Sequence, residues 1–348
     1  MKQVDTLIVG FGLAGLAYAE TLYQAQNSFH VIDAQSSGSS HIAAGIYNPT
    51  VLKRFNMTWH GDHFHQYSLP FYATIAKRLS KDIIHPASIF KLFSQPSDHN
   101  LWSVASDQKT LHKYLDPKIY FDPIDGVSAT FGYGKVMHCG RIDTTLLISS
   151  YKAAIRTHVT TGQLDYSKLV IAHDSVSYGD VKAKRVVFCE GYAMVSNPFF
   201  NALPLQGSKG QILLIRAPKL KIEAILKGPI FIAPLGDDLY WAGASFEPTD
   251  KSLTLTTEGK EWLITKIDKM LDIPYEIVDH RTHIRPTVTD RRPLLGTHST
   301  FNHLHLFNGL GSRGVLTAPL AAKWLFDAIH DREPLKAEVN INRFKKNP

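Results

Sequence analysis

The sequence carries the glycine spacing G-x-G-x-x-G twice, once near each end of the chain. The first set lies in "TLIVGFGLAGLAYAE" and the second in "NGLGSRGVLTAPL": Gly10, Gly12 and Gly15, then Gly309, Gly311 and Gly314. Glycines with this spacing, between a strand and a helix, let the backbone turn sharply and approach a phosphate closely. The free N–H groups at the start of the helix attract negative charge. Both turns are therefore candidate anion-binding sites.

The first turn sits in a complete dinucleotide-binding pattern. The apolar run Asp5–Gly10 predicts a strand, Leu13–Gln26 has helical periodicity, and "FHVID" predicts a second strand that ends at the acid Asp33. Asp33 is placed to accept a hydrogen bond from a ribose hydroxyl. The pattern fits NAD and FAD equally. The same residues could also form a signal-peptide core ending in Ala-Tyr-Ala, but strand, turn and helix account for them better.

The second turn lies between a predicted strand, His303–Phe307, and a predicted helix, Val315–Ile329. Pro319 is expected to kink or delay this helix. A second complete dinucleotide unit is excluded, because no further strand with a terminal acid follows. We therefore expect this helix to face the other end of the same cofactor. A reduced flavin carries negative charge at N1 and C2=O, which the start of a helix would stabilise.

A loop of small residues, "SSGSSHIAAGIYNP" (Ser36–Pro49), follows the first acid directly. Its residues Ala43, Ala44 and Gly45 would let a ligand lie close to the backbone. An ordinary surface loop is the alternative interpretation.

Composition sets the frame for these motifs. The chain has 348 residues, 44% of them hydrophobic, with a formal net charge of +7 and two cysteines. This size allows one large or two ordinary domains with a substantial core. Two cysteines are too few for a disulfide framework, so we expect a cytoplasmic location. No apolar run is long enough for a membrane span, and no internal repeat is present.

Taken together, the motifs resemble the superfamily of FAD-dependent amine and amino acid oxidases over nearly the whole chain. The resemblance is also carried by "RVVFCEGYA", "LPLQGSKGQILLI", "IFIAPLGDDLYWAGASFEP" and "HIRPTVTDRRPLLG". The C-terminal 65 residues are similar to the FAD domain of the bifunctional tRNA 5-methylaminomethyl-2-thiouridine biosynthesis enzyme, whose methyltransferase domain has no counterpart here.

The resemblance implies an α/β fold with two domains. A discontinuous Rossmann-like FAD-binding domain would comprise 1–81, 139–205 and 286–348. A mostly antiparallel β-sheet substrate domain (α+β) would be inserted as 82–138 and 206–285.

The resemblance also implies FAD as the cofactor, bound non-covalently, since neither Cys139 nor Cys189 sits where covalent attachment is expected. The residues that it implies for FAD binding are Gly10, Gly12, Leu13, Ala14, Gly15, Asp33, Ala34, Ser40, His41, Ala43, Ala44, Gly45, Ile46, Glu190, Gly191, Gly309, Gly311, Ser312, Gly314, Val315, Leu316 and Thr317.

Four residues are implied for the substrate site. Arg285 matches the family's Arg-Pro arginine, which anchors the substrate carboxylate, and a guanidinium can bind both carboxylate oxygens at once. Arg313 lies in the flavin turn, where related proteins also carry an arginine. Phe231 and Phe246 match pocket positions and would form an aromatic wall. The alternatives are structural ion pairs for the arginines and ordinary core packing for the phenylalanines. Arg281, Arg291 and Arg292 are nearby alternatives that we expect to be solvated.

The expected reaction is oxidation of the C–N bond of a carboxylate-bearing amine, a glycine-like amino acid or an N-substituted glycine, by hydride transfer to flavin N5. The imine would then be hydrolysed by water, with no strict need for a side-chain base. O₂ or another compound would accept the electrons. One alternative is a stand-alone tRNA-modifying oxidase that removes a carboxymethyl group from a wobble uridine amine. Basic pairs such as Lys53-Arg54 and Lys77-Arg78 favour it slightly. A second alternative is a non-catalytic flavin-binding module.

A histidine-rich stretch, "WHGDHFHQ", raises the question of a metal. On a helix, His60 and His63 would share a face but His65 would not. We expect a solvated or helix-packing cluster here and no metal site.

Overall fold

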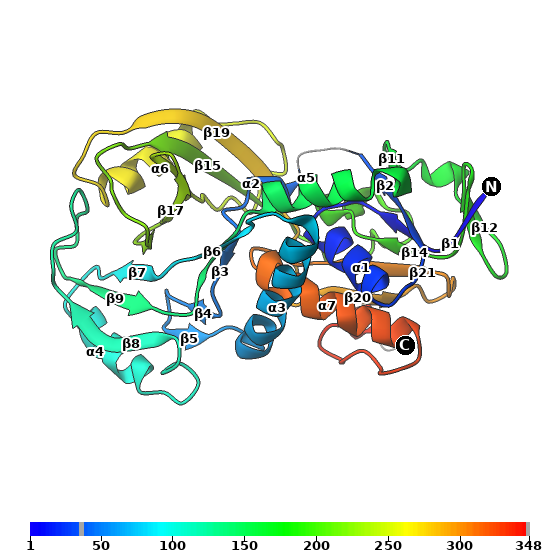
Figure 1. Ribbon diagram of the computed structural model, residues 1–348, viewed down its shortest axis with the longest axis horizontal. Helices are drawn as coiled ribbons and strands as arrows, with labels where there is room; N and C mark the ends of the chain where they lie inside the picture. The colour runs from blue at the N-terminus through cyan, green and yellow to red at the C-terminus, as the bar shows by residue number, and fades with distance from the viewer. Residues whose placement is uncertain (35–37, 346–348) are drawn as a thin grey trace.

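An eight-stranded sheet forms the centre of the first lobe of the computed structural model, which describes residues 1–34 and 38–345 (Figure 1). Its strand order is β11-β2-β1-β14-β13-β12, with β21 also paired to β14 and β20 to β21. The bounds are β1 Lys2–Val9, β2 Phe29–Asp33, β11 Val159–Thr161, β12 Val170–Ile171, β13 Val176–Tyr178, β14 Val181–Phe188, β20 Leu294–Thr297 and β21 Leu304–Asn308. In the middle of this sheet β1 runs parallel to β2 and to β14, and β14 runs parallel to β21. This parallel core is what the first glycine pattern predicts.

Helices cover this sheet and bring the two ends of the chain together. The bounds are α1 Leu13–Gln24, α2 Ser39–Ile42, α3 Gly61–Leu79, α5 Thr144–Ala154 and α7 Gly314–Ile329, with short 3₁₀ helices at Arg156–His158, Tyr166–Lys168, Gly191–Ser196 and Ile341–Phe344. α1 packs against α7, and α7 packs against α3. α1 and α7 are thus adjacent although they lie at opposite ends of the sequence.

The helix α7 contains Pro319 and is not delayed by it, contrary to the expectation from the sequence. It begins at Gly314 and continues to Ile329. Proline has no N–H, so the carbonyl of Val315, four residues earlier, lacks its usual donor in the helix. The hydroxyl of Tyr72 on α3 donates to that carbonyl at 2.8 Å and satisfies it. A contact from a neighbouring helix thus compensates for the proline.

The second lobe is built on an eight-stranded sheet of order β19-β15-β18-β17-β16-β7-β9-β8. All neighbours are antiparallel except β16 and β7. The bounds are β7 Ile89–Leu92, β8 Leu115–Tyr120, β9 Tyr133–Val136, β15 Ser208–Arg216, β16 Ile225–Lys227, β17 Phe231–Gly236, β18 Leu239–Gly243 and β19 Glu276–Arg285, with helices α4 Ser97–Ser106 and α6 Thr257–Asp268.

The two faces of this second sheet have different neighbours. Leu213 and Ile232 point to the face covered by α6, where they pack with Leu263 and Ile267. The alternate residues point to the opposite face, where Ala233 packs with residues of the first lobe. We call this opposite face the inner face.

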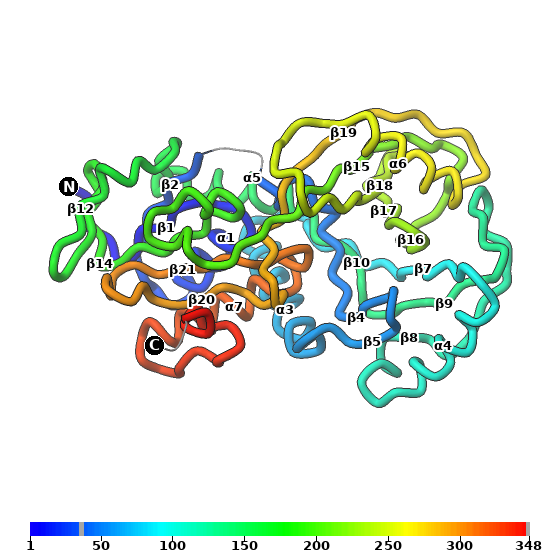
Figure 2. Tube along the Cα trace, turned by 180° about the vertical axis from the view of Figure 1, so that it is seen from behind, coloured from blue at the N-terminus to red at the C-terminus, as the bar shows by residue number. Residues whose placement is uncertain are grey.

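Short strands join the lobes. The three-stranded sheet β3-β10-β6 comprises Ile46–Tyr47, Gly140–Ile142 and Ile84–Pro86, and the hairpin β4–β5 comprises Thr50–Val51 and Asn56–Met57. Figure 2 shows this hairpin beside the second sheet, and Phe55 from it packs with Ile89 of β7. All strands of the second sheet fall within 82–138 and 206–285, whereas β6 pairs with strands outside those ranges. The division into domains remains a proposal. Among the described residues, no helix has the length and apolar character to cross a membrane.

Candidate active site

The two glycine turns meet in the first lobe. A Cβ atom built on Gly314, the first residue of α7, would lie 3.3 Å from Cδ1 of Leu13, the first residue of α1. No side chain at the N-cap positions Gly12 and Arg313 caps either helix. Two helix starts, neither of which is capped by the side chain of its own N-cap residue, therefore lie side by side, an arrangement suited to a ligand with separate electronegative parts.

The first turn is packed so closely that only glycine fits. A Cβ on Gly15 would lie 2.1 Å from the carbonyl oxygen of Gly10, and one on Gly10 would lie 2.7 Å from the carbonyl oxygen of Cys189. Gly10 also has a φ of +91°, which disfavours other residues. Gly12 differs, because its Cβ would meet only the hydroxyl of Ser40, at 3.0 Å. The same hydroxyl accepts a hydrogen bond from the Leu13 N–H at 3.1 Å, so Ser40 lies at the start of α1.

Asp33 ends β2 as predicted, and both of its carboxylate oxygens have partners in the protein. Oδ1 accepts a hydrogen bond from the Phe11 N–H at 3.0 Å, and Oδ2 forms an ion pair with Lys152 of α5. Lys152 was not identified from the sequence. It lies 119 residues away in the chain, and no local pattern marks it. The role of Asp33 toward a ribose hydroxyl remains a prediction.

The second turn is tied to the segment that follows Arg285. The N–H of Gly311 donates to the carbonyl of Pro286 at 3.0 Å. Gly309 and Gly311 have φ values of +73° and +58°, in the region that favours glycine. The strand-to-helix turn therefore fixes the position of the end of β19, where Arg285 lies.

Arg313 is half-buried and binds two main-chain carbonyls. Its Nη1 donates to Asn48 at 2.7 Å and its Nη2 to Thr50 at 3.1 Å. Burial lowers the pKa of Arg313 from its ordinary value, although an arginine stays charged near neutral pH. Within the described part of the chain both of these hydrogen-bond partners are uncharged. Arg313 therefore ties the start of α7 to Asn48, near the end of the loop of small residues, and to Thr50, the first residue of β4.

Arg285 lies on the inner face at the end of β19. Its Nη2 donates to the carbonyl of Ser245 at 2.8 Å, and its Nη1 contacts the hydroxyl of Ser208 at 3.3 Å. Burial lowers the pKa of Arg285, and the charge of Glu247 opposes this effect. Glu247 itself accepts hydrogen bonds from Gln211 and Ser245. The guanidinium is therefore partly desolvated and hydrogen-bonded only to uncharged oxygens among the described residues.

A row of residues crosses the inner face of the second sheet in register. Arg281 is opposite Ile212, Ile212 is opposite Gly243, and Gly243 is opposite Phe231. Arg285 and Arg281 therefore share this face with Phe231, because residues that pair across strands point to the same side. The predicted anchor and one predicted aromatic wall residue lie on one surface.

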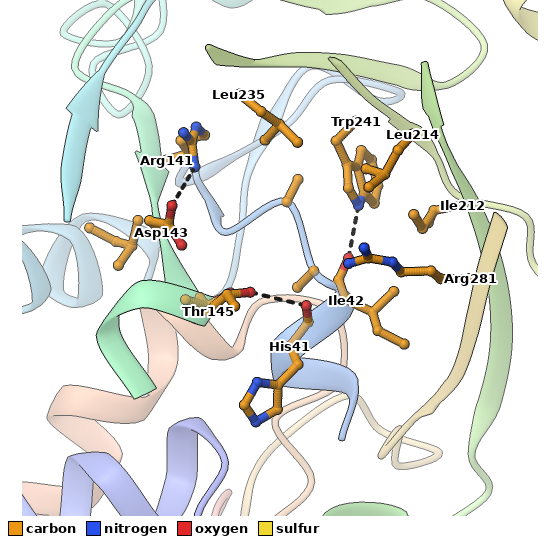
Figure 3. A pocket seen from close by; sticks show the side chains of 14 residues that line it. His41, Ile42, Arg141, Asp143, Thr145, Ile212, Leu214, Leu235, Trp241 and Arg281 are labelled. Carbon is orange, nitrogen blue, oxygen red and sulfur yellow. Dashed lines mark hydrogen bonds and ion pairs between the residues drawn. The ribbon is translucent and has the colours of Figure 1, made fainter. Parts of the chain in front are cut away.

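Figure 3 shows a cavity of about 150 Å³ between this surface and the loop of small residues. Trp241 and Arg281 line it from the sheet, and His41 and Ala44 line it from the loop. The indole N–H of Trp241 donates to the carbonyl of Ile42 at 2.8 Å, which fixes the loop to the sheet. Arg281 is paired with Asp279 at 2.6 Å, and its side chain is 45% exposed.

The structure places other predicted residues less centrally. Phe246 is 69% exposed, so its role as a pocket wall remains a prediction. Glu190 accepts hydrogen bonds from Tyr166 and Asn197, and burial raises the pKa of its carboxyl. Gly191 is open, with no atom within 4 Å of a built Cβ.

The remaining residues predicted to bind the cofactor lie at the starts of α1 and α7 and in the segment that leads from the end of β2 to β3. Gly45 packs against β10, because its Cβ would lie 1.9 Å from the carbonyl of Ile142. Val315, Leu316 and Thr317 are buried in the first turn of α7. The others are Ala14 in α1, Ala34 after β2, Ala43 at the end of α2, Ile46 in β3 and Ser312 before α7.

The histidine-rich stretch and the two cysteines lie in packed parts of the described chain. The stretch enters α3, where Asp62 accepts hydrogen bonds from Tyr114 and Lys113. No group of three or more metal-ligating side chains occurs in residues 1–34 and 38–345. Cys139 is buried, and burial raises the pKa of its thiol to about 12. A protonated thiol of this kind is a poor nucleophile.

The family model "FAD dependent oxidoreductase" (DAO) matches residues 5–328. The tRNA 5-methylaminomethyl-2-thiouridine biosynthesis bifunctional protein of Marinobacter nauticus is 22% identical over 93% of this chain and 55% of its own length. The chain thus spans about half or less of the length of the bifunctional relatives. Glycine oxidase of Pseudomonas aeruginosa is 23% identical, over 94% of this chain and 95% of that protein. The crystal structure of glycine oxidase from Geobacillus kaustophilus superposes with a TM-score of 0.83 at 18% identity and covers 99% of this chain and 100% of that one.

Proposed function

Because the chain belongs to the DAO family of FAD-dependent oxidoreductases, we propose that it oxidises the C–N bond of a carboxylate-bearing amine, either a glycine-like amino acid or an N-substituted glycine. The family and the α/β fold expected from the sequence are confirmed, and FAD is the cofactor of the family. The substrate class is our inference. The observation that carries it is the half-buried Arg285, which shares the inner face with Phe231 and has only uncharged hydrogen-bond partners among the described residues.

The residues present fit a bound FAD. The close-packed turn at Gly10 and Gly15 lies beside the starts of α1 and α7, whose N-cap side chains form no cap, and together they form a cradle in which backbone N–H groups can meet an anionic ligand. Leu13 and Gly314 bring the two starts together. FAD, when bound, accepts the hydride from the substrate. We infer non-covalent binding, because the thiol of Cys139 is buried and protonated.

Arg285 would orient the substrate. Its planar guanidinium can hold both oxygens of a carboxylate, which fixes the carbon next to the amine in space. The carbonyl of Ser245 and the hydroxyl of Ser208 hold the guanidinium in place. Phe231 would cover the apolar part of the substrate and exclude water from it.

A stand-alone tRNA-modifying oxidase is the second candidate. Its support is the similarity to the tRNA-modifying bifunctional protein over 93% of this chain, together with the net charge of +7. If tRNA is the substrate, its affinity should fall steeply with salt, because lysines and arginines release counterions when they bind phosphates. Tight binding to one tRNA at high salt would favour this candidate over a free amino acid. If the protein were a non-catalytic flavin-binding module, it would have no need to hold the guanidinium of Arg285 in a fixed position.

The decisive experiment replaces the proposed anchor. Arg285→Ala should retain FAD, because the two glycine turns lie in the other lobe. It should lower kcat/KM for carboxylate-bearing amines roughly a hundredfold or more, which corresponds to a loss of several kcal/mol of transition-state stabilisation. Arg285→Lys should rescue little, because an ammonium cannot reproduce the planar pair of donors. Amines without a carboxylate should lose little.

Arg216→Ala is the control for loss of a positive charge, because Arg216 lies at the other end of β15, has a side chain that is 49% exposed and is paired with Glu276. It should leave kcat/KM nearly unchanged. If Arg285→Ala spares carboxylate substrates while Arg313→Ala abolishes their turnover, the anchor is Arg313. If neither change distinguishes carboxylate-bearing from plain amines, the proposed substrate class is wrong.

A further inference from the structure

Two lysines extend the inner-face row beyond Phe231. Lys227 of β16 is opposite Phe231 of β17, and Lys91 of β7 is opposite Lys227. Paired residues point to the same side of a sheet, so both lysines share the inner face with Phe231 and Arg285. Lys53 lies in the turn between β4 and β5, and its charge acts on Lys227.

The two inner-face lysines are held in apolar surroundings. Nζ of Lys227 lies 4.7 Å from the centre of the Phe231 ring, and Nζ of Lys91 lies 6.0 Å from the centre of the Phe55 ring. Their hydrogen bonds go to main-chain carbonyls, that of Leu92 at 2.8 Å for Lys91 and that of Gly228 at 2.8 Å for Lys227. Main-chain carbonyls carry no net charge, so these hydrogen bonds leave the two half-buried ammonium groups without a compensating negative charge.

No carboxylate neutralises this group among the described residues. Asp98 is a carboxylate whose charge does act on this group, because it favours the protonated form of Lys91. Its Oδ2, however, already accepts hydrogen bonds from the N–H and the hydroxyl of Ser94. Burial, followed by the charges of Lys91 and Lys53, lowers the pKa of Lys227 to about 8. Like charges on one surface are unfavourable unless an anion joins them.

We propose that Lys91 and Lys227, with Lys53 at their edge, form a second anion-binding subsite of the substrate pocket, which takes a phosphate or phosphonate group carried by the substrate. The proposal rests on the proposed function in one respect, that Arg285 takes the carboxylate of the same molecule. A phosphate is the favoured group because a dianion balances two ammonium charges, which one carboxylate cannot do.

The sheet gives the approximate length of such a substrate. The guanidinium of Arg285 lies over Gly210 of β15, since a Cβ there would meet it. From β15 to β16 there are three strand steps, through β18 and β17, or roughly 14 Å between backbones. Lys227 shortens the gap by reaching over Phe231. The phosphate must therefore be set apart from the carboxylate by a spacer that crosses the Phe231 ring.

The test compares two series of N-substituted glycines on the FAD-loaded protein. One series carries a terminal phosphonate on spacers of two to six methylene groups, and the other carries a methyl group in its place. At one spacer length the phosphonate should raise kcat/KM by roughly tenfold or more. Lys91→Met/Lys227→Met should abolish this gain and leave turnover of the methyl series and the FAD content unchanged.

Lys118→Met/Lys135→Met is the matched control for net charge. Lys135 is opposite Phe90 and therefore points to the outer face, and Lys118 precedes Ile119, which pairs on the inner face with Gly134. This variant should keep the gain. No gain at any length, or a gain that survives in Lys91→Met/Lys227→Met, overturns the proposal. Loss of FAD from that variant also overturns it, because the lysines would then serve the cofactor.

A binding measurement separates this proposal from the proposed function. Saturated ω-phosphonocarboxylates of matching length contain no amine and cannot be oxidised, but they should perturb the flavin absorption spectrum on binding. If no amine is oxidised and these compounds still bind in a way that depends on Lys91 and Lys227, the subsite stands and the proposed reaction fails. If they bind no better to the unaltered protein than to Lys91→Met/Lys227→Met, the subsite is wrong whatever the enzyme oxidises.

Discussion

Gly210 and Arg285 are in such close contact that a methyl group has no room between them: a Cβ on Gly210 would lie 1.8 Å from Nη2 of Arg285. The two residues lie on adjacent strands, β15 and β19, and point to the same face. A residue with no side chain thus decides where the guanidinium rests.

We predict that Gly210→Ala displaces the guanidinium of Arg285 and weakens carboxylate binding. KM for carboxylate-bearing amines should rise about tenfold or more, with kcat/KM falling in parallel, because a misplaced anchor loses its paired hydrogen bonds. Steady-state kinetics and FAD content measure the effect. Gly38→Ala is the control, since its Cβ meets nothing within 4 Å. Unchanged kinetics in Gly210→Ala would show that Arg285 does not act from its observed position.

Gly12→Ala should separate cofactor binding from folding. Its Cβ would meet only the hydroxyl of Ser40, at 3.0 Å, and its φ of −83° suits alanine. The variant should therefore fold, while the added methyl group lies on the approach of a pyrophosphate to α1. We expect a Tm close to that of the unaltered apoprotein and a markedly higher Kd for FAD, measured by titrating the apoprotein. An unchanged Kd would contradict the assignment of this turn.

Tyr72→Phe tests the compensation for Pro319. The hydroxyl of Tyr72 is the donor that serves the carbonyl of Val315, which has no donor from Pro319. Its removal leaves a buried carbonyl unsatisfied and should lower the free energy of unfolding by roughly 1 to 2 kcal/mol. Urea unfolding measures this change. In a Pro319→Ala background the loss should shrink, because alanine restores the N–H of the helix. An equal loss in both backgrounds would refute this explanation.

The phosphonate gain should depend on pH through Lys227. Burial, Lys91 and Lys53 lower its pKa to about 8, so its charge is present below that pH and is lost as the pH rises above it. For this test the phosphonate is replaced by a phosphate ester on the same spacer, because the second pKa of a phosphate ester is about 6 and its charge stays constant above pH 7.5. The ratio of kcat/KM between the phosphate ester and the methyl compound should therefore fall from pH 7.5 to pH 9.5. A ratio that is constant or rising over this range would exclude a protonated Lys227 from the subsite.

Local patterns predicted the backbone of the two glycine turns well. The strand, turn and helix around Gly10 and the acid Asp33 follow from a contiguous stretch of sequence, and so does the start of α7 at Gly314. These features depend on short-range backbone geometry and on hydrophobic periodicity, both of which a single sequence displays. The close approach of Leu13 to Gly314 is what the two turns together imply.

Contacts between distant segments were not predicted. The pairing of Lys91 with Lys227 depends on the parallel register of two short strands, which the sequence does not specify. The ion pair of Asp33 with Lys152 joins residues 119 positions apart. The sequence predicts that Pro319 kinks or delays α7, and the helix is not delayed, because the hydroxyl that compensates for the proline belongs to another helix. Each of these depends on tertiary packing, which no local propensity records.

Both ends of the described chain lie in the lobe that holds the glycine turns, away from the second sheet (Figure 1). A purification tag, a reporter protein or a surface linker attached at either end would therefore be held on the far side of the molecule from the row that runs from Arg281 to Lys91. Protein fixed to a sensor through a terminal tag would present its second lobe to the solution. The variants above can thus be compared in immobilised form, and the same geometry would let a fused partner domain leave that lobe uncovered.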